Sequence, residues 1–263
     1  MEYKLKMENV TKTFVSKRQT TTALKNCSFG VYDNEFLSIV GPSGCGKSTI
    51  IRIIDNIIKP TEGTITIDNI TYSNVIPDEI RRKIGFVFQS HNLLPWMTVR
   101  QNLILPLKIY NLKGTEWDDQ VDMLLEFAKL KDKQNIYVNE LSLGMQQRLG
   151  VVRAMVHNPE ILLMDEPFGS LDKKNMEQLD MDLLDIWERT GKTIIFITHN
   201  VSEAVLLSSR ILVMKTNPGE IVKEFHVPIE RPRSPHVMSQ ETFIQLEYEI
   251  TNTIGELKLS AIK

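Results

Sequence analysis

The sequence predicts an α/β fold in which a buried, mainly parallel sheet is interrupted by a helical insertion. Short apolar runs that end at turn residues are typical of buried parallel strands, and residues 36–40 stop in this way at Gly41 and Pro42. Such runs alternate with stretches of helical spacing, as expected for strand–helix–strand units. Between Gln89 and Pro159 the strand signals disappear and helical patterns take over, which predicts a helical subdomain inserted into the sheet domain.

The individual elements follow from hydrophobic spacing. Residues 3–10 alternate apolar and charged side chains and predict a strand, residues 47–58 carry isoleucines at helical intervals, and residues 64–68 alternate again. Further strands are predicted at residues 84–88, 161–164, 193–198 and 211–214, with a short one after Glu220, and further helices at residues 117–130, 143–157 and 173–190. A proline-broken stretch, residues 228–235, then precedes a final amphipathic helix that carries Phe243, Leu246, Ile250, Ile254 and Leu257.

Composition and charge exclude several classes of protein. With 31 Lys and Arg against 33 Asp and Glu, the net charge of −2 lacks the general positive field of nucleic-acid binders, so no nucleic-acid partner is expected. The two cysteines, Cys27 and Cys45, argue against a disulfide-stabilised secreted scaffold. The longest apolar run, residues 49–58, is too short to span a membrane and includes Arg52 and Asp55. Any membrane-spanning part of a transport process is therefore expected on another chain.

A glycine-rich loop between the strand at residues 36–40 and the following helix predicts a phosphate-binding site. Its glycines let successive backbone N–H groups point into one concavity, and the helix start adds partial positive charge there. Lys47 can reach the β- and γ-phosphates of a nucleotide, and Ser48 can offer its hydroxyl to Mg²⁺. The alternative is a plain glycine-rich turn. At this helix start the thiol of Cys45 is expected to have a lowered pKa and to be sensitive to alkylation. The loop that fits G-x-x-x-x-G-K-[ST] consists of Gly41, Pro42, Ser43, Gly44, Cys45, Gly46, Lys47, Ser48 and Thr49.

Polar residues follow three of the predicted buried strands. Asp165 and Glu166 end the strand at residues 161–164, where open α/β sheets bind ligands. Asp165 is placed to hold Mg²⁺ through water, and Glu166 to polarise an attacking water. His199 ends another strand and can contact the γ-phosphate or hold that water, while Gln89 can ligate Mg²⁺ or orient water. Read one at a time, these residues could equally be solvated or structural strand ends.

Taken together and in this order, the motifs resemble the ATP-binding subunit of ABC transporters over roughly residues 3–230. The resemblance implies a P-loop, RecA-like sheet lobe with an N-terminal antiparallel β subdomain and an inserted helical subdomain near residues 90–158. It divides the chain into an ATP-binding domain, residues 1–230, and a helical tail, residues 231–263. The matching motifs are the Q-loop glutamine Gln89, the Walker B acids Asp165 and Glu166, a D-loop with Ser170 and Asp172, the switch histidine His199, the signature residues Ser142, Leu143, Gly144 and Met145, and Phe14 as the aromatic that stacks on adenine.

The family pattern implies a head-to-tail homodimer that holds ATP between its two copies. Ser142 and Gly144 open a helix and can form a second anion site, whose phosphate would belong to the nucleotide on the other copy. The family usually has Gly at the position of Leu143 and Gln at that of Met145. These departures are expected to weaken the sandwich or slow turnover.

A narrower resemblance points to the nitrate/sulfonate/taurine type of importer. Residues 92–102, 168–172 and 218–222 fit that group. Within the first stretch, the apolar residues 94–96 form either a docking patch for a membrane subunit or part of the helical core, and the sequence leaves both open.

The expected function is hydrolysis of ATP with Mg²⁺ at the cytoplasmic face of the membrane, to which the chain would be peripherally attached. It would drive uptake of a small anionic or nitrogen- or sulfur-containing solute through a separate permease, supplied indirectly by a substrate-binding protein. The alternatives are a soluble ABC-type ATPase, a slow ATP-gated clamp, and another P-loop class. The sequence contains no guanine-recognition motif for that last class.

Overall fold

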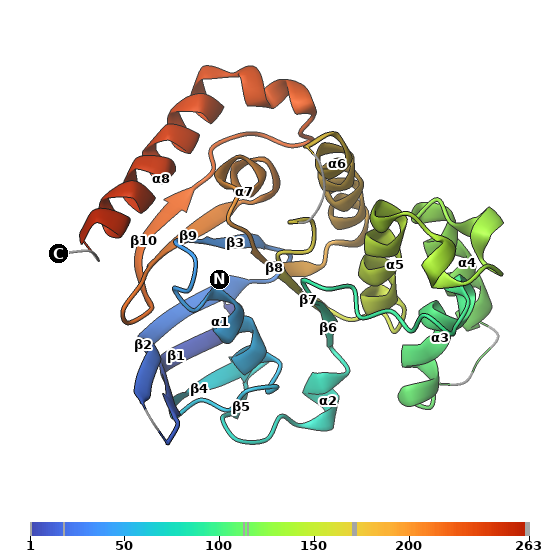
Figure 1. Ribbon diagram of the computed structural model, residues 1–263, viewed down its shortest axis with the longest axis horizontal. Coiled ribbons are helices and arrows are strands. Elements are labelled where there is room, and N and C mark those ends of the chain that lie inside the picture. Colours follow the sequence, from blue (N-terminus) through green and yellow to red (C-terminus); the bar gives the residue numbers. More distant parts are fainter. Residues whose placement is uncertain (1, 18, 113, 115, 170–172, 261–263) are drawn as a thin grey trace.

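A six-stranded sheet forms the centre of the computed structural model, which describes residues 2–17, 19–112, 114, 116–169 and 173–260 (Figure 1). Its strand order is β10-β9-β3-β8-β7-β6; the strands from β9 to β6 are parallel, and β10 is antiparallel to β9. The buried strands predicted from apolar runs are confirmed, because each has side chains covered on both faces. The strands are β3 (Phe36–Val40), β6 (Ile84–Val87), β7 (Ile161–Asp165), β8 (Thr193–Ile197), β9 (Arg210–Lys215) and β10 (Glu220–His226).

A second, antiparallel sheet has the order β2-β1-β4-β5. Leu5 and Met7 on β1 (Tyr3–Val15) point into the core, as the alternation predicts, and β4 (Glu62–Ile67) pairs beside it. The strands β2 (Thr20–Tyr32) and β5 (Ile70–Tyr72) were not among the predicted elements. The two sheets are joined where the N–H of Lys25 donates to the carbonyl of Gly219 at 2.9 Å.

Helix α1 (Lys47–Ile54) lies between the two sheets and carries Ile50, Ile51, Ile53 and Ile54 fully buried. It ends four residues before the predicted bound of residue 58. Asn56 adopts a left-handed backbone conformation (φ 56°), which stops the helix. The apolar spacing continues beyond this point because Ile58 still packs against the same core.

A helical lobe follows β6, next to the edge of the central sheet (Figure 1). It contains α3 (Val99–Ile109), α4 (Glu116–Phe127) and α5 (Leu143–Met155), and its described residues hold no strand of either sheet, as predicted. The short α2 (Asp78–Arg81) and α3 were missed. Thr98 caps α3: its hydroxyl accepts from the backbone N–H of Gln101, and the Gln101 side-chain oxygen accepts from the backbone N–H of Thr98. The sequence therefore did carry a start signal for this helix.

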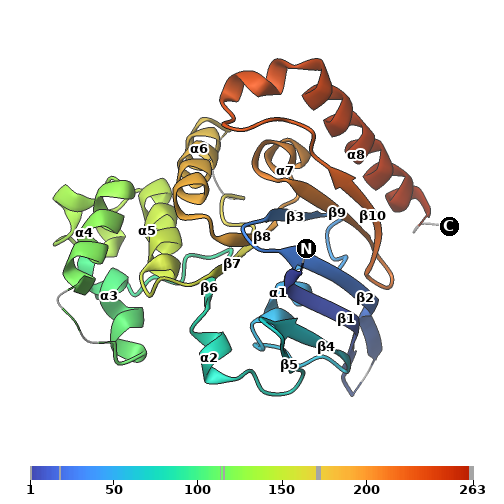
Figure 2. The ribbon, with the colours of Figure 1, turned by 180° about the vertical axis from the view of Figure 1, so that it is seen from behind.

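The face of the central sheet opposite α1 is covered by α6 (Lys173–Thr190), α7 (Val201–Leu207) and α8 (Glu241–Ser260) (Figure 2). Helix α8 buries Phe243, Leu246 and Ile250 against the main core, as its predicted amphipathic pattern requires. The buried guanidinium of Arg233 donates to the carbonyls of Val205, Leu206, Ser208 and Ile229, at 2.8–3.2 Å, and so fixes the start of the tail to the end of α7. None of the described helices is both long enough and apolar enough to cross a lipid bilayer.

A stability prediction follows from Asp55, the residue that ends α1. Burial raises the pKa of its carboxyl from 3.8 to about 7, and the charge of Arg81 opposes this shift only in part. The folded chain therefore holds a proton that the unfolded chain has lost, so this group's contribution to the free energy of unfolding falls as the pH rises from about 4 to about 7. Asp55→Asn is expected to stabilise the fold by on the order of 2 kcal/mol at about pH 8, after allowance for solvent screening.

The measurement is thermal or urea unfolding of both chains at several pH values. The gain from Asp55→Asn should vanish at about pH 3 and below, where the wild-type carboxyl is mostly protonated in both states. Asp119→Asn, an exposed site on α4, is the control and should show no such pH-dependent difference. A gain that is the same at every pH would contradict the assignment.

Candidate active site

The loop between β3 and α1, residues 41–49, is the predicted phosphate cradle, and its shape depends on two glycines. Gly44 and Gly46 have φ values of 76° and 100°, a backbone region that side chains rarely allow. A Cβ on Gly46 would also lie 2.6 Å from a methyl carbon of Leu24. The loop therefore turns sharply enough for the start of α1 to face the enclosed space, where its free N–H groups favour an anion.

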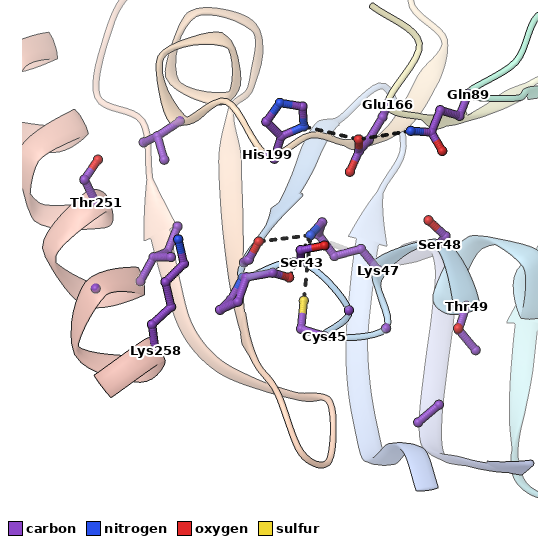
Figure 3. A pocket seen from close by; sticks show the side chains of 18 residues that line it. Ser43, Cys45, Lys47, Ser48, Thr49, Gln89, Glu166, His199, Thr251 and Lys258 are labelled. Carbon is purple, nitrogen blue, oxygen red and sulfur yellow. Dashed lines mark hydrogen bonds and ion pairs between the residues drawn. The ribbon is translucent and has the colours of Figure 1, made fainter. Parts of the chain in front are cut away.

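Lys47, the first residue of α1, is folded back into this cradle (Figure 3). Its side chain is buried, and its Nζ donates to the carbonyls of Gly41 at 2.9 Å and Pro42 at 3.1 Å. These bonds hold the ammonium inside the loop before any ligand arrives. A cation held in this way is positioned for phosphate oxygens, with little side-chain freedom left to lose on binding.

Beside the lysine, Ser48 and Asp165 meet although they are 117 residues apart. The Ser48 hydroxyl donates to Oδ1 of Asp165 at 2.6 Å, and Nη2 of Arg52 lies 3.4 Å from Oδ2. Asp165 is 1% exposed at the end of β7. A hydroxyl and a carboxylate side by side are hard oxygen ligands of the kind that Mg²⁺ takes, so this donor set fits the ion.

Glu166, the next residue, turns its carboxylate toward two residues from neighbouring strand ends. Its Oε2 lies 3.2 Å from Nδ1 of His199, which follows β8, and 3.5 Å from Nε2 of Gln89, which follows β6 (Figure 3). Its backbone is left-handed (φ 45°), and its N–H donates to the carbonyl of Ile197 at 2.9 Å. This twist separates the Glu166 side chain from that of Asp165, so the two adjacent acids occupy different places.

The cradle and this carboxylate open into one cavity of about 870 Å³. The cavity brings together all nine predicted loop residues with Gln89, Glu166 and His199. Asp165 and Phe14 are not among its lining residues, and the D-loop residues Ser170 and Asp172 lie outside the described part of the chain. Its volume falls in the range of small-ligand sites.

The signature residues are not at this cavity, since they begin helix α5 in the helical lobe. Ser142 is the N-cap of α5, and its side chain accepts from the N–H of Met145 at 3.4 Å. Leu143 is 43% exposed, and Met145 packs against the core. Apart from the adjoining residues and the helix's own backbone, no atom of the described residues lies within 4 Å of a Cβ built on Gly144. This helix start is open to a molecule from outside the chain.

Comparison with known proteins decides the family, because residues 24–169 match the family model described as ABC transporter. The chain belongs to the ABC transporter family. The family match, together with the relatives and the solved structure described next, confirms three predictions. They are the resemblance drawn from the motifs, the P-loop fold and the classification as an ABC-type ATP hydrolase.

Three similar proteins are import ATP-binding subunits. The aliphatic sulfonates import protein SsuB of Bacillus subtilis is 39% identical over 254 residues, covering 95% of this chain and 96% of its own. The nitrate import protein NrtD of Synechocystis sp. is 37% identical over 256 residues (95% and 94%). The taurine import protein TauB of Ruegeria pomeroyi is 39% identical over 259 residues (97% and 95%).

A solved ABC cassette has the same fold. It is a dimer in a post-hydrolysis state bound to ADP and Pi, with a TM-score of 0.75 and 39% identity, covering 86% of this chain and all of its own.

The expected lowered pKa and alkylation sensitivity of Cys45 are wrong: the thiol is 1% exposed, and burial raises its pKa above the usual value, with nearby Lys47 opposing only in part.

Phe14 is 43% exposed on β1, and Nζ of Lys12 lies 4.9 Å from its ring centroid. Stacking of adenine on Phe14 remains a prediction. The Lys12 ammonium already lies over this ring.

Sequence reasoning missed one side of the cavity, which is formed by the C-terminal helix. Thr251, Ile254, Gly255 and Lys258 of α8 line the same space as the phosphate cradle. The spacing of apolar residues predicted that α8 packs on the core. It gave no indication that another face of this helix lines the cavity. Ala23 and Val201 also line the cavity without having been predicted.

Proposed function

We propose that this chain hydrolyses Mg-ATP in a head-to-tail homodimer and drives import of a small solute through a separate membrane permease. One observation carries the proposal: the phosphate cradle and the Glu166 carboxylate share a cavity, while the helix start at Ser142 lies in another lobe. A second copy can bring its own Ser142 helix start to the nucleotide. The solved dimeric cassette supports this arrangement.

In the proposed reaction, a water beside Glu166 attacks the γ-phosphate in line with the bond to the leaving ADP. Glu166 accepts the proton of that water. His199, which lies next to Oε2 of Glu166, positions this carboxylate and contacts the phosphate. Lys47 stabilises the charge on the transferred phosphoryl group. Gln89, whose amide lies 3.5 Å from the same Oε2, orients the attacking water.

Ser48, Asp165 and Gln89 are the proposed side chains for Mg²⁺, which when bound neutralises charge on the phosphates. Among the described residues, no group of three or more His, Cys, Asp or Glu side chains could hold a metal ion. The remaining ligands of Mg²⁺ would therefore come from the nucleotide and water, as is common for this ion.

The partners are proposed from the relatives and from one exposed aromatic. Those relatives are import subunits for aliphatic sulfonates, nitrate and taurine, which favours an anionic or nitrogen- or sulfur-containing solute and, indirectly, a substrate-binding protein. Trp96 is 68% exposed, so it is not part of the helical core and supports a docking patch for the permease. We propose peripheral attachment at the cytoplasmic face of the membrane, with residues 1–230 as the ATP-binding domain and residues 231–263 as a helical tail.

A slow ATP-gated clamp is the second candidate, favoured by the exposed Leu143 at the signature helix start. Both candidates bind ATP, but only the importer releases phosphate continuously. The test is to purify the chain with its membrane partner and measure steady-state phosphate release. We expect a polytopic membrane protein to co-purify and turnover to rise in the assembly. A chain that stays soluble and partnerless would refute the import role, and ATP binding without turnover would favour the clamp.

A further inference from the structure

Helix α8 forms a wall of the nucleotide cavity with one defined face. Its lining residues, Thr251, Ile254, Gly255 and Lys258, are spaced by three, four and seven positions and therefore share one side of the helix. In Figure 3, Thr251 and Lys258 lie on the far side of Ser43 from Ser48 and Thr49. Because Phe243, Leu246 and Ile250 are buried in the core, packing fixes the position of this wall.

Gly255 keeps this wall open. Glycine inside a helix costs roughly 1 kcal/mol relative to alanine, so it needs a reason here. A Cβ built on Gly255 would have no atom within 4 Å, which shows that packing within the described chain does not require glycine at this position. Its effect is to leave room in the cavity beside the helix.

Lys258 adds a positive charge to this side of the cavity. Within the described part of the chain, no carboxylate lies within ion-pair distance of its Nζ, whereas Lys215 on the neighbouring β9 is paired with Glu220 at 2.7 Å. A lysine in the last turn of a helix also stabilises the helix, because it is attracted to the negative end of the helix dipole. The neighbouring exposed position, Leu259, could carry a lysine with that same effect but does not line the cavity.

We infer that α8 is part of the nucleotide-binding site and that Lys258 is an additional cation for the phosphates of bound ATP. The inference rests on the proposed ATP-binding function and adds to it a residue outside the 24–169 segment that matches the family model. Lys47 holds the phosphates from within the cradle, and Lys258 contributes attraction from across the cavity. Because this attraction acts at a partly solvated site, it depends on salt and on the charge of the ligand.

The test is equilibrium binding of a non-hydrolysable ATP analogue and of ADP to the full chain, at low and high salt. Lys258→Gln is expected to weaken binding of the triphosphate about two- to fivefold at low salt, with a smaller effect on ADP and at high salt. Combining Lys258→Gln with Leu259→Lys keeps the net charge and the helix-dipole effect but moves the charge off the cavity, so it should bind as weakly. Gly255→Glu should also weaken binding, because it adds a negative charge to the same face of the helix.

Each contrary result has a distinct meaning. Equal affinities of the wild-type and Lys258→Gln chains, or full recovery in the combination with Leu259→Lys, would overturn the inference alone. Tighter binding by Lys258→Gln would overturn it and identify α8 as an obstruction. An unchanged affinity with weaker dimerisation would also overturn it and place α8 against the second copy. If the wild type binds no nucleotide, the proposed function fails and this inference fails with it. Matching thermal unfolding curves check that each variant is folded.

Discussion

Glu166→Gln is expected to lower ATP turnover by about two to three orders of magnitude while leaving ATP binding intact. Glutamine keeps the size of the side chain and can still meet His199 and Gln89, but it cannot accept the proton of the attacking water. The cradle around Lys47 is untouched by this change, so the nucleotide should still bind. Steady-state phosphate release and equilibrium ATP binding measure the two effects separately.

The same variant should accumulate as an ATP-held dimer, because hydrolysis would no longer separate the two copies. Size-exclusion chromatography with light scattering, with ATP and with ADP, would show the shift. Glu8→Gln, an exposed site on β1, is the matched control and should keep both turnover and the monomer–dimer balance of the wild type. Normal hydrolysis by Glu166→Gln would remove Glu166 as the base, and a persistent monomer with ATP would count against the nucleotide sandwich.

Lys47→Ala is expected to reduce ATP affinity by about two orders of magnitude, and turnover with it. The substitution removes the ammonium held between the carbonyls of Gly41 and Pro42, together with its charge-assisted bonds to phosphate. It also leaves those two carbonyls without a cation in the empty loop, so thermal unfolding should be recorded alongside binding. Isothermal calorimetry with ATP is the direct measurement.

Lys59→Ala provides the comparison, since Lys59 is exposed and lies outside the cavity. Its removal makes the same change in net charge and should leave ATP affinity within about twofold of the wild type. If Lys47→Ala bound ATP as well as Lys59→Ala does, the cradle would not be the phosphate site.

Much of the fold was readable from the sequence because buried parallel strands are nearly continuous apolar runs. The runs in β3 and β7 gave their positions to within a residue, and α6 was predicted with its observed ends because Gly191 (φ 59°) stops it. Strand β2 was missed because its first half is exposed and threonine-rich, so its burial pattern is not that of a core strand. Helix α3 was missed because Pro106 interrupts its pattern, although the Thr98 cap marks its start.

The site was predictable where its residues share a local motif, as in the loop at residues 41–49. The site was harder to predict where segments that are distant in the sequence meet. The contact of Ser48 with Asp165 follows from placing both at the same edge of the sheet, which the motifs implied. The approach of α8 to the cradle depends on how Arg233 and the core orient the tail, and such long-range packing leaves no local signal in residues 251–258.

The place of Gln89 has a mechanical consequence. Glu166 and His199 follow adjacent strands of one sheet, and the N–H of Glu166 is bonded to β8, so their separation is set by a rigid frame. Gln89 instead leads into the helical lobe, and its amide reaches the carboxylate at 3.5 Å, the outer limit of a hydrogen bond. A swing of that lobe by even a fraction of an ångström at this connection would make or break the bond. The presence or absence of this one hydrogen bond would therefore depend on how the helical lobe is oriented relative to the central sheet.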